Sequence, residues 1–372
     1  MKKIVRNIIL LGALLFAINQ CIHAFFLPFT WGDKDLHAKM TFYNNNKDDY
    51  SALFVGGSLV YRHIDPTIMD SICQANGIDF SAFNTGVDGV AFLKQMRVIE
   101  AVLKAPSPEL KYIFVSLSST TRFKYLNMHT KRFATWQRPQ EMIRAIRLTW
   151  ELNIPIKQKL KFSWYYFITM LENGFNVGLM TDAIQYLTHP ETEYVTTTLG
   201  ENNDGFFPYD EQEQLVFEED TWEYKMQEMM LLSRKNYVEQ VGRRDTMLLQ
   251  NIHEFEHYNP NHVLNSMLNR YKKMIDACEK KGIQLIVIMP PRIREPYTHL
   301  IPTFNQLPES NKINLASPIE YPEFYQPENS YNFYHLNKKG ATLYTNELTK
   351  QFLKLQGIHS EDLLDNTKTE TE

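Results

Sequence analysis

Short apolar segments that end in glycine or proline turns alternate with amphipathic segments in both halves of this chain. Strands without polar alternation are buried on both faces, and strands separated by helices pair in parallel. Helical patterns over 65–75 and 91–104 separate the first three of these segments. The sequence therefore predicts an α/β fold in which helices cover both faces of a parallel sheet. The predicted strands are 51–55, 80–83, 111–115, 283–289 and 313–315.

A long, aromatic-rich helical stretch over 122–261 separates the two halves. Each half alone has few strands for a sheet, so we interpret this stretch as an insertion into one α/β core. That core would comprise residues 50–121 and 262–356. The polar segment 34–49 predicts a stalk, and the acidic segment 357–372 predicts a disordered tail.

The first 33 residues predict a membrane anchor (1–33). Basic residues, the last of them Arg6, precede a segment without Asp, Glu, Lys or Arg that extends to Asp33. A bilayer core requires about 20 apolar residues, and the basic flank predicts an N-terminus that stays inside. A cleaved signal peptide is the alternative, although Ile22 would stand at the −3 position of its cleavage site. Under either interpretation, the rest of the chain is exported to the periplasm or the extracellular side.

The composition excludes several classes of protein. Of the 372 residues, 44% are hydrophobic, which suffices for a large core, while a mean hydropathy of −0.37 excludes a polytopic membrane protein. The balance of 39 Lys+Arg against 43 Asp+Glu argues against nucleic acid as a partner. With 3 Cys the chain is not a disulfide scaffold. Cys73 and Cys278 lie in apolar helical patterns, which leaves buried thiols and one disulfide both open.

Polar motifs follow the predicted strands where their carboxyl ends should meet. Ser58 follows the first strand after two glycines, the glycine-containing segment 84–89 follows the second, and His335 precedes the last helix. Ligands bind at this edge of open α/β sheets. In such an arrangement His335 would take the proton of the Ser58 hydroxyl, and backbone N–H groups of 84–89 would bind an oxyanion.

These motifs resemble the sequence blocks of the SGNH/GDSL hydrolase superfamily over roughly 50–120 and 262–356. The segment ending in Gly57-Ser58 is similar to the first block, with Gly57 in place of the usual Asp. The resemblance implies a three-layer, flavodoxin-like α/β/α fold and a serine esterase or acyltransferase that forms an acyl-enzyme. It further implies Ser58 as nucleophile, His335 as base, and the N–H groups of Ser58 and Gly89 as oxyanion donors.

The chain departs from the family pattern at two positions. Asn332 stands where the family has the Asp that orients the histidine, and Ser118 stands near the place of an oxyanion-binding Asn. Asn332 can accept a hydrogen bond from the imidazole, but it offers no charge to the imidazolium, a loss that reduces rates by several orders of magnitude. The alternative function is therefore a catalytically inactive scaffold or glycan-binding protein on the same fold.

The predicted anchor narrows what the resemblance implies. Membrane-tethered bacterial members of the superfamily work beside a membrane-bound O-acyltransferase and place acetyl or alanyl groups on cell-surface polysaccharides. We therefore expect a glycan substrate, such a membrane partner, no nucleic acid, and neither a cofactor nor a metal. Asn84, Arg292 and Arg294 are further candidates for binding a sugar or anionic substrate.

Other patterns have simpler interpretations. His253-Glu254-Phe255-Glu256-His257 matches the H-E-x-x-H motif of zinc peptidases, but the predicted helix ends at once and no third-ligand motif follows. We interpret it as a helix end with surface histidines. The acidic run 210–223 lacks the spacing of a calcium loop. His63, a second candidate base near Ser58, is interpreted as a solvent-exposed histidine.

The basic and aromatic segment 157–167 allows two interpretations. Lys157, Lys159 and Lys161 precede a run of aromatic residues, a pattern found in helices that lie on membrane surfaces. The simpler interpretation, which we favour from the sequence, is a core helix whose basic face is solvated.

Overall fold

The computed structural model describes residues 2–25, 31–118, 133, 135–177, 198–294 and 296–358. The chain divides into two compact units. We call the first the helical unit and the second, which contains the sheet, the α/β unit. The helical unit comprises Met1–Ala38 and Thr120–Val195, and the α/β unit comprises Lys39–Ser119 and Thr196–Glu372.

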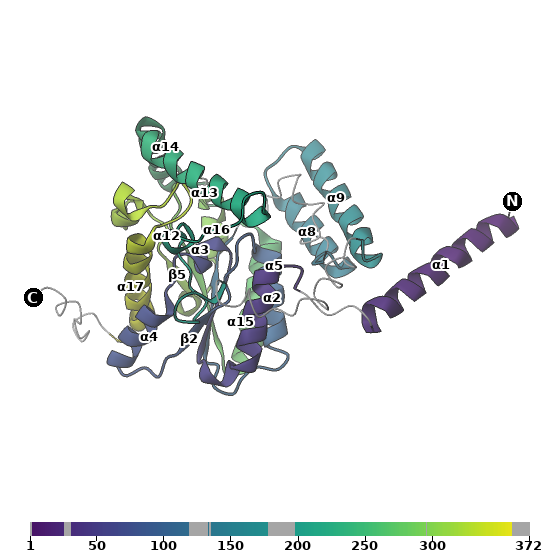
Figure 1. Ribbon diagram of the computed structural model, residues 1–372, viewed down its shortest axis with the longest axis horizontal. Coiled ribbons are helices and arrows are strands. Elements are labelled where there is room, and N and C mark those ends of the chain that lie inside the picture. Colours follow the sequence, from purple (N-terminus) through teal and green to yellow (C-terminus); the bar gives the residue numbers. More distant parts are fainter. Residues whose placement is uncertain are drawn as a thin grey trace, which may run out of the picture. The chain divides into compact units, whose positions relative to one another are not determined.

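A five-stranded, all-parallel sheet forms the centre of the α/β unit, which confirms the predicted mixed α/β architecture. The strand order is β2-β1-β3-β4-β5, so strands from both halves of the chain join one sheet. Figure 1 shows helices on both sides of it, with α4 and α17 on one side and α5 and α15 on the other. The strands are β1 (Ala52–Val55), β2 (Ala82–Asn84), β3 (Tyr112–Ser116), β4 (Gln284–Met289) and β5 (Lys312–Asn314).

Side-chain caps fix the starts of the two helices α4 and α17. The carboxylate of Asp65 accepts the Thr67 N–H before α4, and Asn337 Oδ1 accepts the Gly340 N–H before α17. The helices of the α/β unit are α3 (Ser58–Tyr61), α4 (Pro66–Ala75), α5 (Phe92–Val102), α12 (Tyr209–Gln212), α13 (Trp222–Glu239), α14 (Val241–Glu256), α15 (Asn265–Glu279), α16 (Ile301–Asn305) and α17 (Lys338–Leu355). Its short 3-10 helices are η1 (Lys47–Asp49), η2 (Thr298–Leu300), η3 (Glu309–Asn311), η4 (Pro322–Tyr325) and η5 (Pro327–Asn329).

Aromatic rings fill the core between the sheet and α17. Phe54 of β1 stacks on Phe114 of β3 with ring centroids 4.8 Å apart, and Phe352 of α17 meets Phe114 edge-on at 5.2 Å. Cys73 and Cys278 are buried and both are free thiols, which decides between the two alternatives that the sequence left open.

The segment predicted as a stalk is instead a helix, α2 (Lys34–Asn45), followed by η1. Its second half belongs to the α/β unit, where Met40 and Tyr43 are buried and Phe42 stacks on Phe83 of β2. The stalk prediction was wrong because it was based on the polar run near Asp48. The residues before that run have apolar side chains at helical spacing.

The predicted insertion over 122–261 is divided between the two units. From Thr196 onward the chain belongs to the α/β unit, and the Asn84 N–H of β2 donates to Asp204 O at 2.7 Å. Gly205 has a φ of +87°, and a Cβ on it would lie 2.0 Å from Asn84 O. These are backbone contacts, which leave no apolar pattern in the sequence.

Replacing Gly205 by alanine is expected to lower the free energy of unfolding by about 3 kcal/mol, because a backbone clash adds to left-handed strain. Gly282→Ala is the matched control, since Gly282 has a φ of +74° and a Cβ on it would meet no atom within 4 Å. Left-handed strain alone should cost it about 1–2 kcal/mol. Chemical denaturation of the full-length protein measures both. Equal losses would show that Gly205 is not packed against β2.

The helical unit contains α1 (Lys2–Phe25), α8 (Pro139–Glu151) and α9 (Ile156–Gly174). Among the described residues, α1 is the helix that is long and apolar enough, over Lys2–Cys21, to cross a membrane. This agrees with the predicted anchor, whereas its orientation stays a prediction. Residues 359–372 of the predicted tail lie outside the described residues.

Candidate active site

Ser58 stands at the carboxyl end of β1, as the first residue of the short helix α3. Two glycines lead to it because the chain is crowded at this turn. A Cβ on Gly56 would lie 2.1 Å from the Val60 side chain, and one on Gly57 would lie 2.8 Å from Val90 O. The structure therefore leaves no space for an Asp at position 57.

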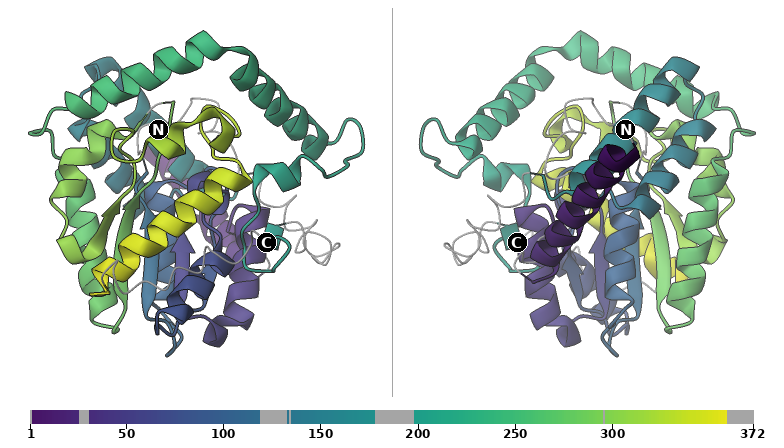
Figure 2. Two further views of the ribbon diagram at one scale, coloured as in Figure 1. Left: turned by 90° about the vertical axis from the view of Figure 1, so that its left-hand side faces the viewer. Right: turned by 90° about the vertical axis from the view of Figure 1, so that its right-hand side faces the viewer.

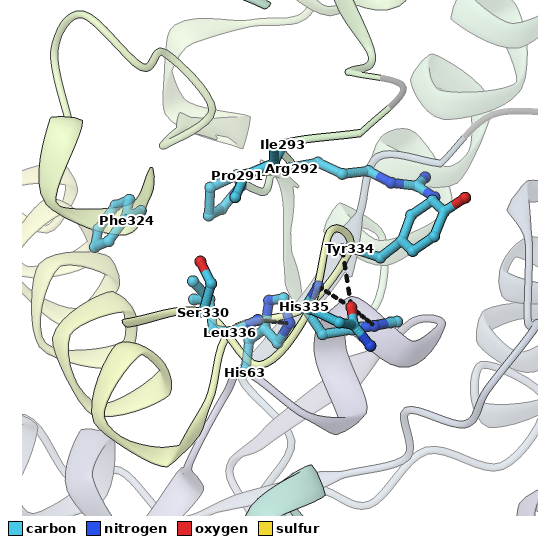
Figure 3. Close-up of a pocket in the computed structure, with 10 residues that line it drawn as sticks. His63, Pro291, Arg292, Ile293, Phe324, Ser330, Tyr334, His335 and Leu336 are labelled. Atoms are coloured by element: carbon cyan, nitrogen blue, oxygen red, sulfur yellow. Dashed lines mark hydrogen bonds between the residues drawn. The ribbon is translucent and has the colours of Figure 1, made fainter. Parts of the chain in front are cut away.

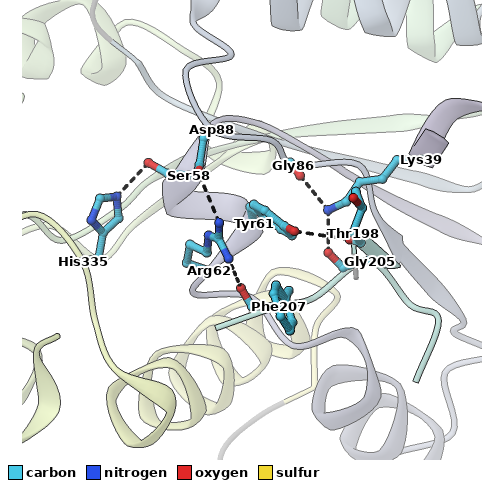
Figure 4. Close-up of polar contacts among 10 residues, drawn as sticks. All are labelled: Lys39, Ser58, Tyr61, Arg62, Gly86, Asp88, Thr198, Gly205, Phe207 and His335. Atoms are coloured by element: carbon cyan, nitrogen blue, oxygen red, sulfur yellow. Dashed lines mark hydrogen bonds and ion pairs between the residues drawn. The ribbon is translucent and has the colours of Figure 1, made fainter. Parts of the chain in front are cut away.

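The loop before α17 brings His335 to Ser58. The distance between His335 Nε2 and Ser58 Oγ is 2.8 Å, although 277 positions separate the two residues (Figure 4). Both side chains are half-buried. This distance is that of a hydrogen bond between a hydroxyl and an imidazole, the contact that general-base activation of a serine requires.

Asn332 determines which nitrogen of His335 carries the proton. Its Oδ1 accepts the backbone N–H groups of Tyr334 at 2.9 Å and His335 at 3.1 Å, and it lies 3.2 Å from His335 Nδ1. Because two backbone donors point at this atom, it is the amide oxygen, and Nδ1 must be the protonated nitrogen. Nε2 is then unprotonated and accepts the Ser58 hydroxyl.

The surroundings of His335 keep it neutral. Burial lowers the pKa of His335 well below its ordinary value, and the positive charges of Arg292 and Arg62 lower it further. The amide of Asn332 adds no negative charge that would raise the pKa again. The imidazole is therefore a base at neutral pH, and its protonated form is disfavoured.

His63 is buried rather than exposed as predicted from the sequence. Its Nε2 accepts the backbone N–H of Leu336 at 3.0 Å, and its carbonyl accepts the Thr345 hydroxyl of α17. Burial lowers the pKa of His63, and its neutral ring meets His335 edge-on at 5.8 Å. The prediction was wrong because α17 covers this position, and His63 holds the His335 loop in place.

Two backbone N–H groups next to the serine have no acceptor among the described residues, those of Ser58 and Gly89. The Ser58 N–H is free because the first residues of a helix lack an intrahelical partner. Gly89 has a φ of +73°, and its loop is held to the serine turn by the Val87 N–H, which donates to Gly56 O at 3.2 Å. An oxyanion hole requires free backbone donors of this kind.

The side chain of Asn84 is held inside the protein, so its role in substrate binding stays a prediction that requires its present hydrogen bonds to break. It is 0% exposed, and its amide group donates to Val60 O at 2.8 Å and Ile64 O at 2.9 Å. Its Oδ1 accepts the Gly86 N–H at 2.8 Å. The first two bonds attach Asn84 to α3 and to the turn that follows it, and the third shapes the 84–89 loop, so Asn84 positions both.

Ser118, Arg292 and Arg294 lie in different surroundings. The Ser118 hydroxyl donates to Gln95 Oε1 at 3.1 Å, so its role as an oxyanion donor stays a prediction that requires this bond to break. Arg292 lines a small cavity together with His335 (Figure 3). The guanidinium groups of Arg292 and Arg294 lie 5.0 and 5.2 Å from the Tyr334 ring.

A buried lysine supports the loop that carries Gly89, which the sequence did not indicate. Lys39 is 0% exposed, and its Nζ donates to Gly86 O at 2.7 Å and Gly205 O at 2.6 Å (Figure 4). It also lies 3.6 Å from the centre of the Tyr61 ring. The predicted stalk placed this residue in solvent, where it would have had no role.

A buried arginine supports the same loop from its other end. Arg62 is 3% exposed, pairs with Asp88 at 3.0 Å, and donates to Phe207 O at 2.7 Å. Its guanidinium also lies 4.4 Å from the Tyr209 ring, which meets His335 edge-on at 4.9 Å. Burial alone would lower the pKa of Arg62, but Asp88 offsets this and raises it, so the arginine stays charged.

Helices α13 and α14 attach to the loops that carry the site; Figure 2 shows them as two successive helices at the top of its left view. Tyr237 of α13 meets Phe333 edge-on at 5.1 Å. Asn251 of α14 donates to Arg292 O at 2.7 Å. This part of the predicted insertion therefore helps to position the site.

The H-E-x-x-H pattern is not arranged as in a zinc peptidase. His253, Glu256 and His257 are exposed and bring ligand atoms within 4.8 Å of one another. Glu254, the residue that would act as the base, instead accepts the Thr298 hydroxyl at 3.2 Å.

Comparison with known proteins found no matching family model, no matching curated protein and no matching solved structure. The chemistry of the site is therefore inferred from its own contacts. Those contacts join a hydroxyl, a neutral imidazole and an orienting amide.

The pKa of His335 is expected to lie below 6.5 in the wild-type protein and to rise in Asn332→Asp, because a carboxylate stabilises the imidazolium. Histidine ¹⁵N NMR of the full-length protein in detergent measures the pKa and the tautomer. His335→Gln assigns the signal. A wild-type pKa above 6.5, or an unprotonated Nδ1, would contradict the geometry.

Proposed function

We propose that this protein is an exported, membrane-anchored serine esterase or O-acyltransferase of the SGNH type that acts on a cell-surface glycan. The observation that carries the proposal is the 2.8 Å contact between Ser58 Oγ and His335 Nε2 at the carboxyl end of β1. The tautomer fixed by Asn332 and the free N–H groups beside Ser58 support it.

In the first half-reaction Ser58 Oγ attacks the carbonyl carbon of an acyl ester, and its proton passes to His335 Nε2. The N–H groups of Ser58 and Gly89 bind the oxyanion of the tetrahedral intermediate. The bond to the leaving alcohol then breaks, and His335 returns the proton to the alcohol oxygen. A sugar hydroxyl or water next attacks the acyl-enzyme, His335 takes its proton, and Ser58 leaves with that proton.

The charges of the site stabilise the oxyanion of this intermediate more than the imidazolium of His335. Arg62 and Lys39 are buried cations that support the 86–89 loop. Asp88 offsets the charge of Arg62, whereas Lys39 donates to backbone carbonyls and favours the negative charge of an oxyanion there. The same cationic surroundings, without a carboxylate at Asn332, disfavour the imidazolium. We therefore expect a slow enzyme.

The glycan substrate and the membrane partner are proposed from the resemblance and from α1. A membrane helix would keep the site near a membrane-bound O-acyltransferase that supplies acyl groups. Arg292 and Arg294 around the Tyr334 ring form a cationic and aromatic surface beside His335. Such a surface binds sugars by stacking and anionic groups by charge.

An inactive scaffold or glycan-binding protein is the second candidate, and Asn332 is the observation that favours it. A site whose histidine is neutral and lacks a charged orienter can bind a ligand without turning it over. The two functions differ in whether Ser58 reacts.

A fluorophosphonate probe is expected to label the wild-type, full-length protein at Ser58. Ser58→Ala should abolish labelling, and His335→Ala should slow it by about 10²–10⁴-fold, because general-base catalysis is lost. In-gel fluorescence and peptide mass spectrometry measure both. A folded wild-type protein that stays unlabelled would exclude the acyl-enzyme proposal and leave the binding protein.

Lys39→Met is expected to slow fluorophosphonate labelling by about tenfold or more, because the loop that carries Gly89 loses its support. Lys47→Met is the matched control, since Lys47 is a partly exposed lysine just after the same helix, and its Nζ donates to Ala105 O, away from the 86–89 loop. Thermal unfolding verifies that both variants are folded. Unchanged labelling in folded Lys39→Met would show that the lysine does not position the oxyanion donors.

A further inference from the structure

Helix α9 of the helical unit turns an apolar stripe outward. The stripe residues are 37–59% exposed. Their spacing of three and four residues places them on one helix face, which normally packs inward. The buried face is a different one, marked by Tyr166 and Thr169, and α9 packs against α8 (Figure 1). The core-helix interpretation was therefore wrong. The stripe residues are Ile156, Leu160, Trp164, Phe167 and Leu171.

The neighbouring helix α8 extends this surface with a second tryptophan. Trp150 is 46% exposed, and its indole N–H donates to Ser163 Oγ at 3.1 Å, so it lies beside the stripe. Tryptophan is enriched where proteins meet the membrane interface, since its ring is apolar and its N–H is polar.

The charges that border the stripe between Ile156 and Leu171 are positive, while Glu172 places an acidic residue at its C-terminal end. Lys157 and Lys161 each follow a stripe residue directly and so border the stripe on one side. No Asp or Glu occurs between Glu151 and Glu172. A basic border complements the phosphates of anionic lipids.

The stripe is continuous with the candidate membrane span. Asn19 Nδ2 and Gln20 Nε2 of α1 both donate to Gly174 O, at the end of α9, at 2.8 Å. Asn176 in turn donates to Asn19 Oδ1 at 3.0 Å. Helix geometry places Asn19 about 26 Å from Lys2, close to the thickness of a bilayer core. These polar contacts therefore fall at the headgroup level.

We propose that the stripe of α9, together with Trp150, docks on the surface of an anionic lipid bilayer, at the side where the C-terminal end of α1 leaves the membrane. The apolar side chains then enter the headgroup boundary, and Lys157 and Lys161 contact lipid phosphates. The inference does not depend on the proposed activity, since the site lies in the other unit.

The test uses full-length protein in nanodiscs of zwitterionic and anionic phosphatidylglycerol lipids. In a Cys21→Ser background, Leu160→Cys carries an NBD label, because Cys73 and Cys278 are buried. Gln158→Cys is the matched control, an exposed position on another face of α9. Doxyl lipids are expected to quench the label at 160 about threefold more than the label at 158. Equal quenching would overturn the proposal.

A charge variant tests whether lipid or another protein covers the stripe. Lys157→Glu with Lys161→Glu should reduce quenching at 160 in anionic nanodiscs and leave it unchanged in zwitterionic ones. The proposal would be overturned if the charge variant left quenching in anionic nanodiscs unchanged. It would also be overturned if the label at 160 became shielded from solvent as the protein concentration rose in detergent, which would indicate a second copy of the chain. Shielding of the label found only in native membranes would indicate a protein partner and would likewise overturn it. Near-UV circular dichroism verifies the fold of each variant.

Discussion

The Oδ1 atom of Asn332 is the acceptor on which the candidate site depends. It receives the backbone N–H groups of Tyr334 and His335, so it shapes the loop before α17. It also faces Nδ1 of the imidazole and so sets the tautomer that directs Nε2 to Ser58. The conformation of the loop before α17 and the position of the proton on His335 therefore both depend on this oxygen atom. An Asp at this position could perform both tasks and would also add a negative charge. The Asn orients the imidazole of His335 without stabilising its protonated form.

Buried cations give the site its electrostatic character. Lys39 and Arg62 support the 86–89 loop. The side chains of both donate to backbone carbonyls, Arg62 also pairs with Asp88, and Lys39 also contacts the Tyr61 ring. Two neutral histidines, His63 and His335, lie near Arg62 with lowered pKa values. The surroundings therefore accept a negative charge more readily than a second positive one. An enzyme of this design would stabilise its oxyanion well and its imidazolium poorly.

Periodicity and turn residues allowed the parallel sheet to be predicted, along with the convergence of Ser58 and His335 at its edge. The glycines before Ser58 and the cap at Asn337 are local signals that require no knowledge of the tertiary structure. Lys39 and His63 could not be placed in this way, since a buried polar residue looks like a surface residue in sequence. The segment around Gly205 was also missed, because it packs through its backbone. The outward stripe of α9 has the same periodicity as a core helix, and burial alone distinguishes them.

The two buried cysteines have a consequence for how the chain matures. Burial raises the pKa of Cys73 and of Cys278 to about 12, so neither forms appreciable thiolate at neutral pH. Thiolate is the nucleophilic form of cysteine, which attacks disulfides and oxidants. The folded α/β unit is therefore inert toward thiol exchange. Because all three cysteines are free, no disulfide-forming catalyst is required to reach this structure.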